Sequence, residues 1–260
     1  MNILVVRNDK LGDFITALPA MYVLKKHNPE NNIIALVAPL NKNLALQCSF
    51  IDEVIVDNGQ NVFALAKSIR SKNIDVSITL FSNTRIAIAQ FLGGIKKRIA
   101  PATKIAQIFY THRIKQRRSQ VKMAEFEYNI ELTKALFTNI SVEYEKPLLQ
   151  FDDSKIIENV FRVNNDIEKE IIAFHVGFGG SSDANWSVDE YEELIRAVLK
   201  EEKYQVVMTF GPDEVDLYEA MQAKFYDANI VFYLSIDGLI YFAKLLSCFK
   251  LFVSTSTGTY

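Results

Sequence analysis

MNILVVRNDKLGDFITALPAMYVL, residues 1–24, decides the fold of this chain. Residues 3–6 form a β-branched apolar run, which predicts a buried parallel strand that ends at Arg7. A polar turn and Gly12 follow the strand. Apolar residues then recur at helical spacing, at Phe14, Ala17, Leu18, Met21 and Leu24. The stretch therefore predicts a strand, a tight turn and one helix, which is the opening unit of an α/β sheet.

Asp13 is the candidate functional residue of this unit. We expect Gly12 to adopt a backbone conformation closed to other residues, so that the turn is sharp and Asp13 lies in the first turn of the helix. This position is at the carboxyl edge of a first strand, where open α/β sheets bind ligands. Asp13 is then either an N-cap, whose carboxylate satisfies helix amides, or a general base beside a cleft. The two roles are compatible.

Size and composition indicate a globular α/β protein. The chain has 260 residues, of which 49% are hydrophobic, enough for two medium-sized cores. No apolar run approaches the roughly 18 residues that span a bilayer, and Arg7 interrupts the apolar start before it could form a secretory signal. We therefore expect a cytoplasmic protein. Cys48 and Cys248 lie far apart in apolar contexts, which favours buried thiols over a disulfide and offers no metal-ligand spacing.

Charge is distributed unevenly along the chain. Residues 1–150 contain 20 Lys and Arg against 12 Asp and Glu, and residues 151–260 contain 9 against 19, so the two parts carry +8 and −10. This asymmetry predicts an anionic partner for the N-terminal part, with solvated surface charge as the alternative. Basic clusters at 96–98 and 112–118 suit an anionic sugar or a phosphate-rich membrane surface. Because no nucleic-acid motif accompanies them, we do not expect a nucleic-acid partner.

Strand and helix patterns alternate in two series, which predicts parallel sheets with helices on both faces. The first series has strands at 33–37, 54–56 and 76–80 and helices at 44–47, 62–69, 85–92 and 124–137. Residues 147–153 form the predicted linker, which divides the chain into domains 1–150 and 151–260. The second series has strands at 171–174, 206–210, 230–233 and 251–253 and helices at 155–161, 188–199 and 239–246.

Two loops of the second series are candidate ligand loops. A glycine-serine loop, residues 175–182, can bring backbone amides close to a phosphate, although it matches neither a Walker loop nor a dinucleotide fingerprint. His175 at its start is either a hydrogen-bonded core residue or a ligand-facing one. Glu214 follows the strand at 206–210, where its carboxylate can accept hydrogen bonds from a sugar hydroxyl or favour a helix N-terminus. The absent G-x-G-x-x-G pattern argues against a Rossmann oxidoreductase.

Four segments together resemble the ADP-heptose:lipopolysaccharide heptosyltransferases, glycosyltransferase family 9. In chain order they are ILVVRNDKLGDFITALPA, FHVGFGGSSDANW, FGPDE and FVSTSTG. The resemblance implies a GT-B fold, in which two Rossmann-like domains face each other across a cleft. The acceptor would bind to the N-terminal domain and the nucleotide-sugar to the C-terminal domain. It also implies metal-independent inverting transfer without a cofactor.

The resemblance assigns roles to individual residues. Asp13 matches the catalytic base, which deprotonates the acceptor hydroxyl as it attacks the anomeric carbon. The neighbouring Arg7, Lys10 and Gly12 would bind the anionic acceptor. The implied donor-binding residues are Gly179, Gly180, Ser181, Ser182, Glu214, Ser256, Thr257 and Gly258.

Two positions depart from the family pattern. Ala184 stands where the family commonly has a lysine for the donor phosphates, and Ser256 replaces an aspartate. The family's final histidine and the helix beyond it would follow Tyr260. From the resemblance we therefore expect a C-terminally truncated second domain.

The sequence thus predicts a glycosyltransferase that moves a heptose from an ADP-sugar to the inner core of lipopolysaccharide or lipooligosaccharide. Its partners would be the nucleotide-sugar, an anionic lipid-linked saccharide and, peripherally, the inner face of the cytoplasmic membrane of a Gram-negative bacterium. The alternative is a catalytically defective remnant that binds acceptor or partner without transfer.

Overall fold

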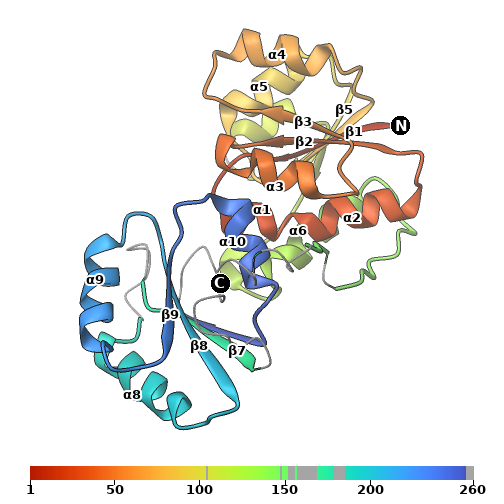
Figure 1. Cartoon of the computed structure of the whole chain (residues 1–260). Coiled ribbons are helices and arrows are strands. Elements are labelled where there is room, and N and C mark those ends of the chain that lie inside the picture. The colour runs from red at the N-terminus through yellow and green to blue at the C-terminus, as the bar shows by residue number, and fades with distance from the viewer. Residues whose placement is uncertain (104, 147, 152–155, 157–168, 178–184, 256–260) are drawn as a thin grey trace. The chain divides into compact units, whose positions relative to one another are not determined.

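A computed structural model describes the chain except residues 104, 147, 152–155, 157–168, 178–184 and 256–260 (Figure 1). The chain divides into two compact units, Met1–Leu149 and Gln150–Tyr260. The predicted boundary, between residues 150 and 151, lies one residue from this division. The predicted helix at 155–161 falls largely outside the described residues.

The first unit is built on a six-stranded parallel sheet with the order β3-β2-β1-β4-β5-β6. Its strands are β1 (Asn2–Arg7), β2 (Asn32–Val37), β3 (Glu53–Val56), β4 (Val76–Thr79), β5 (Lys97–Pro101) and β6 (His112–Ile114). β1 and β2 are almost entirely buried, as expected for apolar strands covered on both faces.

Helices cover both faces of this sheet (Figure 1). α4 (Val62–Arg70) and α5 (Thr84–Leu92) pack on one face, where Leu4, Val6, Leu65 and Ile86 belong to one apolar cluster. The other face carries α1 (Leu11–Ile15), α2 (Leu18–His27), α3 (Lys42–Gln47) and α6 (Glu125–Lys134). Short 3₁₀ helices connect these elements: η1 (Pro39–Asn41), η2 (Ile105–Phe109) and η3 (Arg118–Gln120).

The first helix of the prediction is two helices in the structure. α1 ends at Ile15 and α2 begins at Leu18, with Pro19 in its first turn. Proline has no N–H to donate, and its ring clashes with the carbonyl four residues earlier, here that of Ile15. A single continuous helix was therefore the wrong prediction. The break leaves α1 as a short separate element that carries Asp13 beside the end of β1.

The second unit has a four-stranded parallel sheet with the order β10-β7-β8-β9. Its strands are β7 (Glu170–His175), β8 (Tyr204–Phe210), β9 (Ile230–Leu234) and β10 (Leu251–Ser254). α8 (Val188–Leu199) and α9 (Val215–Lys224) pack on one face through Tyr191, Ile195, Met221 and Phe225. α10 (Leu239–Leu246) packs on the other face through Phe242 and Leu245.

Each sheet has one pair of neighbouring strands at which the strand order reverses. In the first unit this pair is β1 and β4, and in the second it is β7 and β10. Parallel sheets bind ligands at the carboxyl ends of such a pair. The fold thus directs attention to the residues that follow Arg7 and Thr79, and to those that follow His175 and Ser254.

The two cysteines, both predicted to be buried, differ in burial. Cys48 is buried, Cys248 is half-buried, and neither forms a disulfide. Burial raises the pKa of the Cys48 thiol to about 12. Among the described helices, none combines the length and the apolar character needed to cross a bilayer.

Candidate active site

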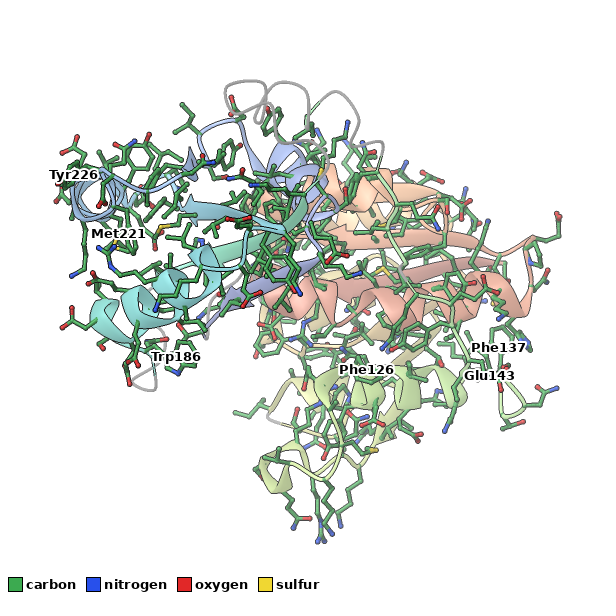
Figure 2. All side chains as sticks on the ribbon, turned by 60° about the horizontal axis from the view of Figure 1, so that its bottom comes forward. Phe126, Phe137, Glu143, Trp186, Met221 and Tyr226 are labelled. Atoms are coloured by element: carbon green, nitrogen blue, oxygen red, sulfur yellow. The ribbon has the colours of Figure 1, made fainter. Side chains whose placement is uncertain are left out.

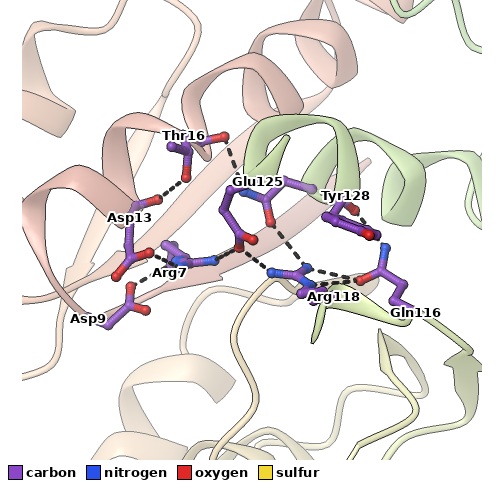
Figure 3. A network of polar contacts seen from close by, with 9 residues as sticks. Arg7, Asp9, Asp13, Thr16, Gln116, Arg118, Glu125 and Tyr128 are labelled. Carbon is purple, nitrogen blue, oxygen red and sulfur yellow. Dashed lines mark hydrogen bonds and ion pairs between the residues drawn. The ribbon is translucent and has the colours of Figure 1, made fainter. Parts of the chain in front are cut away.

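Arg7 is the centre of a charged network at the end of β1 (Figure 3). Its side chain is only 3% exposed, and all three guanidinium nitrogens donate to carboxylates. Nε contacts Asp9 Oδ1 at 2.8 Å, Nη2 contacts Asp13 Oδ1 at 2.6 Å, and Nη1 contacts Glu125 Oε1 at 3.0 Å. The guanidinium also lies over the Phe81 ring, 5.7 Å from its centroid. Arg7 is therefore enclosed, and its nitrogens are occupied by protein carboxylates, whereas the resemblance implied that it binds the acceptor.

Asp13 combines a fixed carboxylate oxygen with an accessible one. Oδ1 is held by Arg7, whereas no described residue donates a hydrogen bond to Oδ2, and the side chain is 37% exposed. The N-cap interpretation is wrong. Lys10 occupies the N-cap of α1, and Asp13 is the third residue of the helix, so its carboxylate lies beyond the capping position. The prediction that Asp13 lies in the first helical turn is confirmed.

Gly12 does not adopt the special backbone conformation that we expected. It lies inside α1, and the described glycines with positive φ are Gly59, Gly94 and Gly238. A methyl group built at Gly12 would meet no atom within 4 Å. The turn is made by residues 8–10 instead, and Gly12 leaves open space next to Asp13.

Glu125, the first residue of α6, joins Arg7 to a second arginine. Its Oε1 accepts hydrogen bonds from both Arg7 and Arg118. Arg118 in turn donates to Gln116 Oε1 through Nε and Nη2, at 3.1 and 3.0 Å, and Gln116 Nε2 donates to the Tyr128 carbonyl. The chain of contacts in Figure 3 thus extends from Asp13 to the segment before α6.

Arg118 borders a hollow of about 400 Å³ at the carboxyl ends of β4 and β5. Phe81, Ser82, Pro101 and Arg117 also line it. Arg117 is exposed, and no described residue forms an ion pair with its guanidinium. It also lines a second hollow of about 450 Å³, together with Lys115 and Lys122. The network around Asp13 therefore adjoins a cationic surface that can receive an anion.

The balance of charge in the network is negative. Two arginines, Arg7 and Arg118, face the carboxylates of Asp9, Asp13 and Glu125. Burial raises the pKa of the Asp9 carboxyl, and the adjacent Arg7 guanidinium opposes that rise. The three carboxylates therefore repel one another, and this repulsion is only partly offset by the two guanidinium groups.

The second unit has its own polar cluster at the carboxyl ends of β7 and β8. His175 is buried, and its Nδ1 lies 3.0 Å from Thr209 Oγ1. Its Nε2 lies 3.7 Å from Glu214 Oε2, which also accepts a hydrogen bond from the Gly211 N–H at 2.7 Å. Burial lowers the pKa of His175, and the Glu214 carboxylate opposes that change. His175 is thus a hydrogen-bonded core residue that also contacts a predicted donor-binding residue.

Gly177 makes room for the Glu214 carboxylate. A Cβ atom at this position would lie 2.0 Å from Glu214 Oε1, inside any allowed contact distance. A side chain at residue 177 would displace the carboxylate from its place between His175 and Gly211. The glycine after β7 is therefore needed for the position of Glu214.

Among the predicted donor-binding residues, Glu214 alone lies within the described part of the chain. Gly179, Gly180, Ser181, Ser182, Ser256, Thr257 and Gly258 lie outside it, as does Ala184. β7 and β10, the strands that lead into those two segments, are neighbours, with His175 opposite Ser254. In the described residues, no group of three or more His, Cys, Asp or Glu side chains could hold a metal ion.

Trp186 marks another surface of the second unit. It lies beside α8 (Figure 2), with its ring 5.4 Å from that of Tyr191. It also borders a shallow hollow of about 400 Å³ with Glu190 and Glu193. The acidic rim makes this hollow unsuitable for a phosphate.

Sequence reasoning did not identify Glu125 or the place of Arg118 in the site. Glu125 was part of a predicted helix and Arg118 part of a basic cluster. Their partner Arg7 lies more than 100 residues earlier, so no local pattern connects them. The shared edge of the parallel sheet was the available signal, because it brings the ends of β1, β4 and β5 together.

Solved structures of glycosyltransferases have the same fold as this chain. E. coli ADP-heptose lipopolysaccharide heptosyltransferase II matches with a TM-score of 0.80 at 18% identity, covering 100% of this chain and 80% of that one. A glycosyl transferase family 9 structure from Veillonella parvula gives 0.84 at 16% identity, covering 99% and 76%. E. coli heptosyltransferase WaaC with ADP gives 0.73 at 20% identity, covering 100% and 82%. The fold is thus that of a GT-B glycosyltransferase with two Rossmann-like domains.

Sequence comparison identifies the family. Residues 62–260 match the model of glycosyltransferase family 9 (heptosyltransferase). A Haemophilus influenzae protein named "Putative glycosyltransferase" is 39% identical over 267 aligned positions, which cover 98% of this chain and 77% of that protein. The chain therefore belongs to glycosyltransferase family 9, and the predicted family and enzyme class are confirmed.

Proposed function

We propose that this enzyme transfers a heptose from ADP-heptose to a hydroxyl of the lipopolysaccharide or lipooligosaccharide inner core. Membership of family 9 supports this proposal, as do the fold matches to E. coli WaaC with ADP and to WaaC with ADP-2-deoxy-2-fluoro heptose. One observation carries it for this chain. A buried arginine fixes one oxygen of Asp13, while the side chain stays partly exposed, and the same network includes Arg118, which borders a cationic hollow.

Asp13 acts as the general base of an inverting displacement. An acceptor hydroxyl within hydrogen-bonding distance of Oδ2 gives its proton to the carboxylate as its oxygen bonds to the anomeric carbon. The bond from that carbon to the donor phosphate breaks on the opposite side, and its electron pair leaves with ADP. The reaction needs no metal for proton transfer, because Asp13 takes the proton directly.

Arg7 is a positioning residue in this mechanism. Its guanidinium is buried and is held by Asp9 and Glu125 as well as by Asp13, so it fixes the direction in which Oδ2 points. Such orientation matters because a displacement of about 1 Å at a reacting group can cost about 100-fold in rate.

The acceptor binds to the first unit through its anionic groups. Exposed Lys10, at the N-cap of α1, and exposed Arg117, in the hollow, supply cations, and Gly12 lets the saccharide approach the helix backbone. The net charge of +8 over residues 1–150 supports an acceptor with carboxylates or phosphates. Because that acceptor is linked to lipid, we place the enzyme at the cytoplasmic face of the membrane.

The donor binds to the second unit. Glu214 accepts hydrogen bonds from the ribose hydroxyls, and the loop at 179–182 offers backbone amides to the diphosphate. Thr257, Gly258 and Ser256 follow β10 and complete the donor site. Glu214, Thr257 and Gly258 are supported by their match to the family motifs. The adjacency of β7 and β10 supports a site formed by the two loops that follow these strands.

A second candidate function is binding without transfer. It is favoured by Ala184 and Ser256, which replace the family's common lysine and aspartate in the donor motifs. Loss of a phosphate-binding lysine would weaken charge compensation of the leaving ADP.

A transfer assay distinguishes the two functions. The full chain is incubated with ADP-heptose and a heptose-deficient core acceptor, and the product is detected by mass spectrometry. Transfer from ADP-heptose, but not from UDP-sugars, is the expected result. If calorimetry detects binding of ADP or acceptor while no product forms with any nucleotide-sugar, binding without transfer is the correct assignment.

A further inference from the structure

One continuous stretch of the first unit has no acidic residue at all. Between Asp75 and Glu125, residues 76–124 contain ten Lys and Arg and no Asp or Glu. In the fold this stretch forms β4, α5, β5, η2, β6 and η3, which together make one end of the first sheet and its covering helix. A segment of this length whose charged side chains are all positive attracts a polyanion or an anionic interface.

Large apolar side chains are exposed in the same stretch. Ile105 and Ile108 of η2 are 77% and 64% exposed, and Phe91 at the end of α5 is 53% exposed. Residues three apart lie on the same side of a 3₁₀ helix, so Ile105 and Ile108 point in one direction. Ala106 and Phe109 form the opposite side, which packs inward against Ala87 and Tyr110. η2 is thus a short amphipathic segment with its apolar side uncovered.

Contacts hold Phe91 and a cation next to η2. The Phe91 ring lies 6.0 Å from the Phe109 ring, and the Arg98 guanidinium lies 5.4 Å from the Phe91 centroid. Arg98 Nε also donates to the Phe109 carbonyl at 2.6 Å. Exposed Lys96 and Arg113 flank this group, on the loop before β5 and on the edge strand β6. We define Phe91, Lys96, Ile105, Ile108 and Arg113 as the η2 surface.

We propose that the η2 surface docks the enzyme on an anionic phospholipid membrane. Apolar side chains surrounded by Lys and Arg are the combination that binds at a lipid interface, where the side chains enter the headgroup region and the cations meet lipid phosphates. A nucleic acid would meet the cations but would leave Ile105 and Ile108 in water. The combination therefore favours lipid.

The η2 surface is next to the proposed acceptor hollow. Pro101 and Thr103 line that hollow, and η2 begins two residues after Thr103. Ser82 also lines the hollow. Its hydroxyl oxygen lies 3.3 Å from the hydroxyl oxygen of Tyr110, the residue that follows η2. A lipid-linked saccharide would reach the hollow from the membrane directly. The biological meaning of the assignment rests on the proposed function, whereas membrane binding can be measured without it.

Vesicle co-sedimentation of the full chain tests the assignment. Binding to vesicles with phosphatidylglycerol, weaker binding to pure phosphatidylcholine, and release by salt are expected. Ile105→Ser with Ile108→Ser, and separately Lys96→Glu with Arg113→Glu, should each raise the lipid concentration for half-binding roughly tenfold. Matched controls of similar exposure and equal charge change, Leu46→Ser with Phe63→Ser and Lys67→Glu with Lys200→Glu, should leave binding within about twofold.

Three outcomes would overturn the assignment. The first is absence of binding to phosphatidylglycerol vesicles, and the second is equal loss in the matched controls. The third is binding of a short RNA duplex that is tighter than vesicle binding and is lost in the Lys96→Glu and Arg113→Glu variant. Thermal unfolding checks that each variant is folded. Transfer to a delipidated, soluble core acceptor should be unchanged in the η2 variants; if the unmodified chain fails there but binds vesicles, the proposed function fails and the docking surface does not.

Discussion

At the residue scale, the position of Asp13 depends on Arg7, a side chain six residues earlier. The two residues lie on different elements, β1 and α1, and the turn between them brings the guanidinium within 2.6 Å of the carboxylate. Asp9 and Glu125 occupy the other nitrogens of Arg7, so the guanidinium cannot rotate away. The carboxylate is thereby held in one orientation with Oδ2 left accessible, as the proposed general base requires.

Gly12 offers a test of acceptor approach that does not alter the charges. Gly12→Ala should keep or raise the stability of the free protein, by up to about 1 kcal/mol, because alanine is the better helix former and its methyl group meets no atom. If the saccharide packs against this backbone, the KM for acceptor should rise several-fold while ADP binding is unchanged. Steady-state kinetics and thermal unfolding measure both effects; an unchanged acceptor KM would show that the acceptor does not approach Gly12.

At the element scale, α6 links the two arginines through its first residue. Glu125→Gln removes the charge that Arg7 and Arg118 share. We expect kcat to fall roughly tenfold, because Arg7 then holds Asp13 less firmly. The KM for acceptor should change little, since Arg117 remains. The control is Glu127→Gln on the same helix, because the glutamine side-chain oxygen can still accept from the Ala124 N–H. An equal fall in kcat in both variants would argue against a role of Glu125 in holding Arg7.

His175 at the end of β7 and Glu214 in the loop after β8 form a pair that predicts a pH dependence of stability. Burial lowers the pKa of His175 in the folded protein. The unfolded chain therefore binds a proton more readily than the folded protein does. Because of this difference, the free energy of unfolding is greatest above about pH 6.5 and decreases as the pH falls below it. Urea unfolding from pH 7.5 downward should show this decrease in the free energy of unfolding. His175→Gln should reduce the slope of that free energy against pH. A slope unchanged by this substitution would contradict the assignment.

The strands and helices show what local sequence can predict. Buried apolar runs identified β1, β2, β4, β7 and β8 because strands covered on both faces must be apolar. β5 and β6 were missed, since Lys97, Arg98 and Arg113 gave them the appearance of a basic loop. Arg113 is compatible with a strand because β6 is an edge, where charge is tolerated and discourages pairing with other chains. Lys97 and Arg98 are compatible with β5 because they lie at its start, where they are only partly buried.

The candidate site was predictable only in part, because some of its residues are brought together by contacts between distant segments. Asp13 and Glu214 follow strands directly, so their positions could be derived from the order of elements. Glu125 and the enclosed state of Arg7 depend on contacts between segments far apart in sequence. Such contacts are set by tertiary packing, and no periodicity encodes them.

At the scale of the whole molecule, the charges of the two units differ in sign. Residues 1–150 carry +8 and residues 151–260 carry −10. Exposed charges act over about 10 Å at 0.1 M salt and are screened at higher salt. The KM for an anionic acceptor should therefore rise several-fold with added potassium chloride. An acceptor with its phosphates removed is the control, and it should show a smaller rise; equal rises would rule out long-range attraction by the first unit.

The central claim is that Asp13 takes the proton of the acceptor hydroxyl, and Asp13→Asn tests it most directly. Asparagine keeps the size and can still accept from Arg7, but it cannot bind the proton. We predict that kcat for heptosyl transfer falls about 10²- to 10⁴-fold, with ADP affinity and thermal stability nearly unchanged. Asp9 binds the same arginine, and Asp9→Asn should lower kcat far less. Transfer by Asp13→Asn within a few-fold of the unmodified enzyme would contradict the account.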